Sequence, residues 1–121
     1  TQVILPLIEN DLLEIMFNAA KGNVESQKIK WKNDYAACVV IASEGYPEAY
    51  KKGLEITFQT DPYDFIHSGT RFENGAFFTN GGRVLNAVAL GSSKKSALER
   101  AYKLASKAQF EGAFFRKDIG S

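Results

Sequence analysis

Three short strand-like segments separated by turns constrain the fold of this chain most. They are Asp64–Ser68, Ala76–Thr79 and Val84–Leu90. Glu73-Asn74-Gly75 lies between apolar segments and is typical of a hairpin turn, because Asn and Gly tolerate a positive φ angle. Strands and helices do not alternate regularly, which argues against a doubly wound parallel sheet. The sequence therefore predicts antiparallel strands joined by short connections.

Two helices and further strands are predicted on either side of this region. Apolar residues at helical spacing indicate a helix over Asp11–Lys21, with Asn10 as its N-cap and Gly22 as its C-cap. A second helix is predicted over Lys94–Gln109. The continuous apolar run Tyr35–Ala42 is expected to form the central strand, with Val40 buried. The remaining predictions are strands at Lys28–Lys32, Leu54–Phe58 and Ala113–Phe115, a loop at Asn23–Gln27 and a short helical turn at Ala49–Lys52.

The predicted fold class is α+β. An antiparallel β-sheet, or a partly closed barrel, would carry flanking helices. The 121 residues suffice for one domain with its own core. A net charge of +1 gives no bulk electrostatic reason to expect a nucleic acid or an anionic membrane as partner. The single cysteine, Cys38, excludes an internal disulfide, and the chain shows neither a signal peptide nor a transmembrane run, so a cytoplasmic location is expected.

Two polar turns form the main candidate binding site. His67-Ser68-Gly69-Thr70 ends one predicted strand, and Asn80-Gly81-Gly82-Arg83 precedes another. If these strands are neighbours, hydroxyls, backbone N–H groups, an imidazole and a guanidinium come together, which suits a phosphorylated or polyhydroxylated ligand. Simpler interpretations stay open. Arg83 could pair with Glu73 to support the hairpin, His67 could bond a nearby loop, and Thr70 could be a turn hydroxyl.

Other chemistry finds little support in the sequence. Cys38 and His67 could in principle form a nucleophile–base pair, but the apolar run around Cys38 would raise its thiol pKa. One His and one Cys make a structural metal site improbable, and no metal site is predicted. The tail Phe114–Gly120 contains Arg116-Lys117 after two aromatics, and it is a second candidate for contact with a nucleotide or phosphate.

Several of these segments, taken together, resemble a known family. The segments are Ala42–Gly53 (ASEGYPEAYKKG), Ile66–Thr70 (IHSGT), Thr79–Leu85 (TNGGRVL) and Phe110–Gly120 (FEGAFFRKDIG), with Leu7–Met16 similar to a helix that leads into them. They resemble the C-terminal domain of the phosphoribosylamine–glycine ligases, which belong to the ATP-grasp superfamily. The resemblance covers essentially the whole chain, with the motifs in the family's order.

The resemblance implies an ATP-dependent ligase of de novo purine synthesis as the full-length protein. Such an enzyme joins glycine to 5-phosphoribosylamine through a glycyl phosphate. It uses ATP and Mg²⁺ (or Mn²⁺), whose ligands would lie outside this chain. Only the last two positions of the family's signature remain, as Thr1 and Gln2. The chain therefore looks like the C-terminal quarter or so of the enzyme, and by itself it is expected to be inactive. Its partner would be the missing ATP-grasp portion.

The resemblance also implies roles for parts of this chain. Residues 1–22 would lead from the ATP-grasp region, and residues 23–121 would form a domain that closes over it and helps bind the phosphoribosyl substrate. Arg83 would bind the substrate phosphate, and the backbone of Gly81 and Gly82 would approach it. Asn80, His67, Gly69 and Thr70 would line the same cleft. The alternative is a non-catalytic binding or interaction module that keeps this fold.

Overall fold

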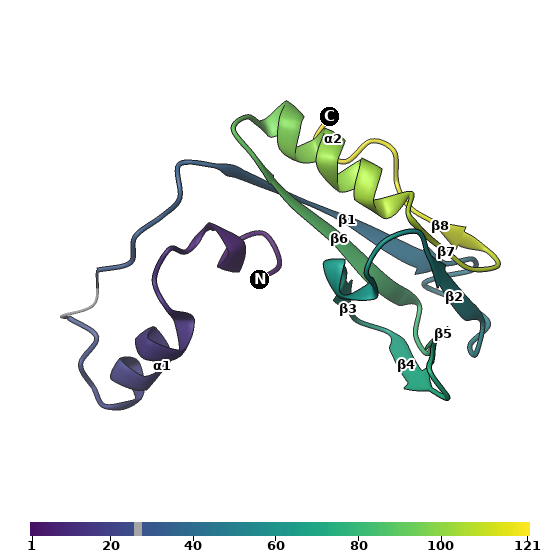
Figure 1. Ribbon diagram of the computed structural model, residues 1–121, viewed down its shortest axis with the longest axis horizontal. Helices are drawn as coiled ribbons and strands as arrows, with labels where there is room; N and C mark the ends of the chain where they lie inside the picture. The colour runs from purple at the N-terminus through teal and green to yellow at the C-terminus, as the bar shows by residue number, and fades with distance from the viewer. Residues whose placement is uncertain (26–27) are drawn as a thin grey trace.

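The computed structural model of the chain describes residues 1–25 and 28–121, and it contains two antiparallel sheets with helices (Figure 1). The first sheet has the strand order β3-β6-β1-β8, and the second has the order β4-β5-β2-β7. The predicted α+β class is confirmed. The strands are β1 Tyr35–Ser43, β2 Glu55–Phe58, β3 Ile66–His67, β4 Thr70–Glu73, β5 Ala76–Thr79, β6 Arg83–Gly91, β7 Ala108–Gln109 and β8 Ala113–Phe114. The helices are α1 Leu12–Ala20 and α2 Lys94–Ala105, with 3₁₀ turns η1 Leu5–Leu7 and η2 Pro62–Asp64.

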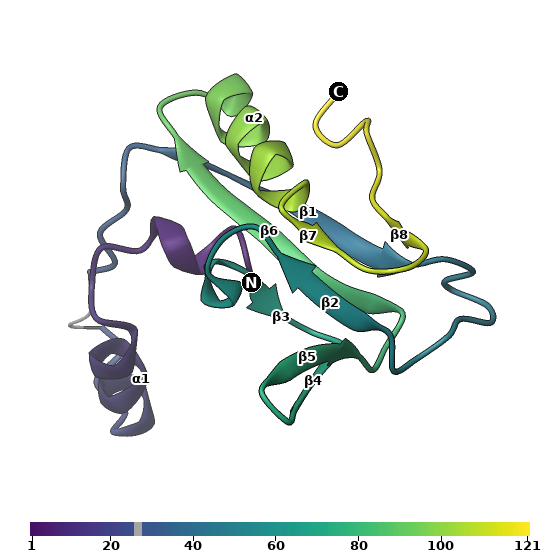
Figure 2. The same ribbon diagram turned by 45° about the vertical axis from the view of Figure 1, so that its right-hand side comes forward.

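The core lies between the first sheet and α2. Strand β1 lies between β6 and β8, which confirms that it is central. Val39 and Ile41 on β1 are buried in the main apolar cluster, whereas Val40, which was expected to be buried, is half-buried on the opposite face. The expectation was wrong because successive side chains of a strand point to opposite faces, and α2 covers only one of them. Figure 2 shows α2 lying along β1 and β6.

Helix α2 packs closely on this sheet through small side chains. Ser93 is its N-cap, with its hydroxyl accepting a hydrogen bond from Ser96 N at 3.1 Å. Three buried alanines share the face toward the sheet: Ala97, Ala101 and Ala105. The helix ends at Ala105 and not at Gln109 as predicted, because Ala108 and Gln109 pair instead with Phe58 and Thr57 of β2.

The second sheet contains the predicted hairpin. Strands β4 and β5 pair from Thr70↔Thr79 to Glu73↔Ala76. Asn74 and Gly75 between them have φ angles of 51° and 83°, which is the backbone conformation that favours Asn-Gly in a two-residue hairpin. The turn prediction is therefore confirmed, although the pattern alone did not assign Thr70–Glu73 to a strand.

The N-terminal region departs most from the predictions. Helix α1 is capped by Asp11 and not by Asn10, since Asp11 Oδ1 accepts hydrogen bonds from Leu13 N (2.8 Å) and Glu14 N (3.3 Å). Asn10 Oδ1 instead accepts a hydrogen bond from Lys30 N at 2.6 Å, which connects it to the segment around Lys30. The predicted strand Lys28–Lys32 is wrong: Trp31 makes one isolated bridge to Ile8 and no regular strand forms there. Helix α1 stands apart from the sheets in both views (Figures 1 and 2).

Two smaller predictions concern connecting segments. The expected helical turn at Ala49–Lys52 is wrong, because this stretch is an irregular part of the β1–β2 connection. Of the loop predicted at residues 23–27, positions 26 and 27 lie outside the described residues.

Candidate functional site

A cleft of about 520 Å³ opens on the face of the first sheet that α2 leaves uncovered. Its floor comes from Cys38 and Val40 on β1 and from Asn86 on β6. Its rim comes from the two polar turns singled out in the sequence, from the β1–β2 connection and from the N-terminus. The lining residues are Gln2, Cys38, Val40, Tyr46, Tyr50, Ser68, Gly69, Gly82, Arg83 and Asn86.

The two polar turns meet because β3 pairs with β6. Ser68 N and Gly69 N both donate to Val84 O, at 3.0 and 3.2 Å, and Asn80 N donates to Gly69 O at 2.7 Å. A Cβ atom on Gly69 would lie 2.5 Å from Arg83 O and 2.8 Å from Gly81 Cα. Backbones can come this close only without a side chain at position 69, which is a physical reason for glycine there.

Arg83 begins β6 at the rim of this cleft. The β1–β6 register shifts between Ile41 and Ala42, so that Ala42 lies opposite Arg83. Such a bulge re-aims the side chains beside it. The Arg83 side chain is exposed, and no hydrogen bond or ion pair joins it to another described residue. Glu73 pairs with Arg71 instead, at 2.9 Å, so the alternative that Glu73 holds Arg83 is wrong.

His67 and Thr70 lie beside the cleft but are engaged with each other. His67 Nδ1 is 2.9 Å from Thr70 Oγ1, and Nε2 is 3.0 Å from Pro62 O. A carbonyl oxygen only accepts, so Nε2 donates to Pro62 O. The ring also packs on Phe77, with centroids 4.6 Å apart. Neither side chain belongs to the described lining of the cleft.

The space above the adjacent glycines is occupied by other parts of the protein. A Cβ atom on Gly82 would lie 2.1 Å from Cδ2 of Tyr46, so the tyrosine ring packs directly on the Gly82 backbone. A Cβ atom on Gly81 would lie 3.1 Å from Gly69 Cα, so these two backbones also approach each other closely. Asn80, next to them, is exposed and bonds Gly69 through its backbone.

Asn86 is a buried polar residue that the sequence reasoning did not select. Its Nδ2 donates to Ile66 O at 3.1 Å and to Ser68 Oγ at 2.7 Å, which ties the Ser68 turn to β6. Its Oδ1 lies 3.9 Å from Cys38 Sγ, and burial raises the pKa of that thiol. A polar side chain inside the apolar run Val84–Leu90 was the available signal, since a buried amide needs hydrogen-bond partners.

Tyr46 and Tyr50 were also missed as cleft residues. Both come from the β1–β2 connection, and their ring centroids lie 6.3 Å apart. This segment has no hydrophobic periodicity from which the position of the two rings beside the first sheet could be predicted.

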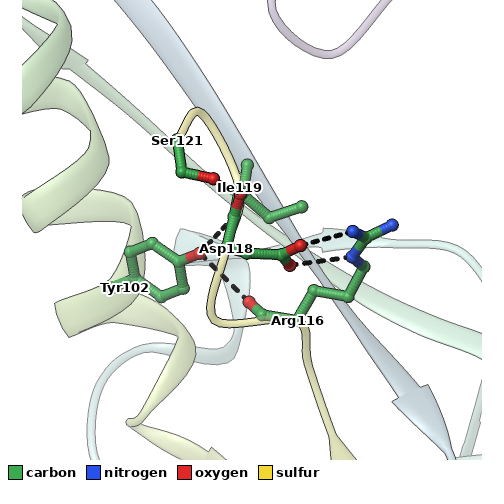
Figure 3. A network of polar contacts seen from close by, with 5 residues as sticks. All are labelled: Tyr102, Arg116, Asp118, Ile119 and Ser121. Atoms are coloured by element: carbon green, nitrogen blue, oxygen red, sulfur yellow. Dashed lines mark hydrogen bonds and ion pairs between the residues drawn. The ribbon is translucent and has the colours of Figure 1, made fainter.

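The C-terminal tail forms a separate polar network on α2 (Figure 3). Tyr102 donates its hydroxyl to Arg116 O at 3.1 Å and accepts from Ile119 N at 2.9 Å. Arg116 and Asp118 form a two-point ion pair, with Arg116 Nε donating to Asp118 Oδ1 at 2.9 Å. This hydrogen bonding lowers the pKa of Asp118 and raises that of Arg116. The Arg116 guanidinium thus already has a carboxylate partner within the tail.

The described residues offer no other ligand chemistry of note. Residues 1–25 and 28–121 hold no group of three His, Cys, Asp or Glu side chains that could bind a metal ion. Within the same ranges, neither helix has the length and apolar character needed to cross a bilayer.

Comparison with known protein families identifies the domain. The family model for the C domain of phosphoribosylglycinamide synthetase matches residues 36–121. The chain belongs to this family. The match begins at the second residue of β1, so this synthetase C domain includes both sheets and α2 but not α1.

Individual relatives agree with the family assignment. The chain is 46% identical to the phosphoribosylamine–glycine ligase of Caldanaerobacter subterraneus, covering 100% of this chain and 30% of that protein. It is 43% identical to the trifunctional purine biosynthetic protein adenosine-3 of Gallus gallus, covering 98% of this chain and 12% of that protein. The crystal structure of the phosphoribosylamine–glycine ligase from Thermotoga maritima superposes with a TM-score of 0.76 at 35% identity. That match covers 96% of this chain and 29% of that one. The chain thus spans under a third of the length of these relatives.

Proposed function

We propose that this chain is the C-terminal part of a phosphoribosylamine–glycine ligase and that its cleft binds the phosphate of 5-phosphoribosylamine. The full enzyme would form glycinamide ribonucleotide from 5-phosphoribosylamine, glycine and ATP in the cytoplasm. The observation that carries the proposal is Arg83, a guanidinium at the rim of a cleft with no partner among the described residues. The family membership and the names of the relatives support it.

The chemistry of the cleft favours a phosphorylated ligand. A guanidinium presents a planar fork of N–H donors, which can bind two phosphate oxygens at once. Ser68 and Asn86 lie in the same lining. The Asn86 NH2 group is engaged by Ile66 O and Ser68 Oγ, so the Ser68 hydroxyl hydrogen and Asn86 Oδ1 are the groups that could bond a sugar. Asn80, Gly81, Gly82 and Gly69 shape the turn that positions Arg83. His67 and Thr70 would support this turn from behind, because their polar atoms bond each other and Pro62.

The ATP-grasp portion is the proposed partner, and α1 is the element that would contact it. Every residue of α1 is exposed or half-buried. Its apolar side chains include Leu13, Met16 and Phe17, which are 75%, 61% and 56% exposed. An exposed apolar helix face of this kind marks an interaction surface. ATP and Mg²⁺ (or Mn²⁺) would be bound by that missing portion, and the boundary between residues 22 and 23 stays a prediction.

Substitution of Arg83 in the full-length ligase tests the proposal. Arg83→Ala should raise the KM for 5-phosphoribosylamine by roughly ten- to a hundredfold, because a hydrogen-bonded charge pair contributes about 1.5–3 kcal/mol. The KM values for ATP and glycine should change much less. Arg83→Lys should restore part of the loss, since an ammonium cannot form the planar fork.

Arg71→Ala is the matched control. Arg71 is also an exposed arginine of this domain, but it is paired with Glu73 on the β4–β5 hairpin and lies outside the described lining of the cleft. Its removal should leave all three KM values unchanged. If Arg83→Ala behaved like Arg71→Ala, the phosphate site would be elsewhere, and the alternative of a non-catalytic interaction module would gain support.

A further inference from the structure

The β1–β2 connection is fixed against the rim of the Arg83 cleft. Ser43 N, at the end of β1, donates to Gly82 O, and Glu44 N, at the start of this segment, donates to Gly112 O, both at 2.8 Å. At its other end Gly53 N donates to Thr79 O at 2.7 Å. These bonds tie the segment to three other parts of the domain, and the segment between them carries Tyr46 to the cleft.

Tyr46 is placed by direct contact with the residue before Arg83. Its ring lies on Gly82, where any Cβ atom would be 2.1 Å from Tyr46 Cδ2. The tyrosine is 37% exposed, and its hydroxyl has no hydrogen bond to another described residue. A phenol hydroxyl is both a donor and an acceptor, and its apolar ring is here held in place by packing. The lining of the cleft therefore includes both the Tyr46 hydroxyl, on a ring held by packing, and the Arg83 guanidinium, although the two residues come from different turns.

We propose that Tyr46 is a second ligand-binding residue of this cleft and that its hydroxyl donates a hydrogen bond to the anion bound by Arg83. The inference rests on the proposed function, which supplies the phosphate, and adds a residue that recognises it. Gly82 then has a structural role in binding: it leaves the space that Tyr46 needs to lie beside Arg83.

The test compares Tyr46→Phe with wild type in the full-length ligase, using ribose 5-phosphate as a competitive inhibitor. Phenylalanine keeps the ring on Gly82 and removes only the hydroxyl, so thermal stability should not change. The inhibition constant should rise roughly tenfold, the lower end expected for a hydrogen bond to a charged group. Ribose without phosphate should bind to wild type and to Tyr46→Phe with equal affinity. If the hydroxyl had only a structural role, its loss would weaken the binding of both ligands.

Two further variants complete the experiment. Tyr63→Phe is the matched control, because Tyr63 is an exposed tyrosine on η2 that packs on Phe77 and is not among the described cleft residues. It should bind ribose 5-phosphate like wild type. In an Arg83→Ala background the effect of Tyr46→Phe should change in size, since two groups that bind one anion are not independent.

The outcomes separate this inference from the proposed function. If Arg83→Ala weakens ribose 5-phosphate binding and Tyr46→Phe does not, the inference is refuted and the proposed function stands. If Tyr46→Phe weakens binding and Arg83→Ala does not, the phosphate role of Arg83 is refuted. If neither variant differs from Tyr63→Phe, both are wrong.

Discussion

Replacing Val39 with alanine should destabilise the domain more than the same replacement at Val40, its neighbour on β1. Val39 is 0% exposed and packs in the cluster that includes the α2 alanines, whereas Val40 is half-buried and lines the cleft. The change removes two methyl groups, worth about 1.6 kcal/mol at about 0.8 kcal/mol per buried carbon. A residual cavity adds to this loss, so Val39→Ala should cost about 2–3 kcal/mol. Val40→Ala leaves no enclosed cavity and should cost about 1 kcal/mol or less.

Urea denaturation of both variants, followed by circular dichroism, measures the two losses. The slope of unfolding free energy against urea should stay the same, so that midpoint shifts report stability directly. Equal losses, or a larger loss at Val40, would mean that α2 does not cover the Val39 face of the sheet. The assignment of the open face, and with it the position of the cleft, would then be wrong.

Two other predictions concern the chain by itself and its tail. We expect the 121-residue chain to have no ligase activity and no tight Mg-ATP binding, because it spans 30% of the length of the ligase that it matches and the proposed ATP-grasp portion would supply the nucleotide site. Calorimetry that gave a micromolar dissociation constant for Mg-ATP would disprove this. Asp118→Asn should loosen the tail, seen as faster amide hydrogen exchange at Ile119, because the Arg116 ion pair is lost while the Tyr102 bonds remain. The pKa of Asp118 is lowered in the folded state, so the ion pair stabilises the tail above the ordinary carboxyl pKa and this contribution is lost as the pH falls through the folded value. Exchange at Ile119 that is equally slow in Asp118→Asn and wild type would show that the ion pair does not hold the tail.

Local sequence signals predicted much of the fold because they act over a few residues. The Asn74-Gly75 turn needs only the backbone freedom of two residues, and the apolar run of β1 reflects its central position. The predictions of secondary structure were wrong where pairing with a segment distant in the sequence determines the structure. The C-terminal end of α2 is set by pairing of Gln109 with β2. The Lys28–Lys32 segment has the alternation of a strand but pairs with the N-terminal segment only through the isolated Trp31–Ile8 bridge.

The candidate site was predictable to the extent that it lies on turns. The meeting of the Gly69 and Gly81 turns depends on the pairing of β3 with β6, which are separated in the chain by β4 and β5. The side-chain partners were not predictable. Arg71 and Glu73 lie two residues apart on β4, so their side chains share one face of the strand and pair there, which leaves Glu73 unavailable to Arg83. The packing of Tyr46 on Gly82 likewise depends on tertiary structure, because the two residues belong to different turns.

The fixed β1–β2 connection limits how an active site that includes this domain could open and close. A lid usually moves on hinge residues while the rest of the structure stays still. Here the two ends of the connection that carries Tyr46 are tied through backbone bonds to Gly112 and Thr79, and the Tyr46 ring packs on Gly82. We therefore expect substrate entry to involve a rigid-body displacement of the whole domain, with Tyr46 and Arg83 arriving at or leaving the substrate together.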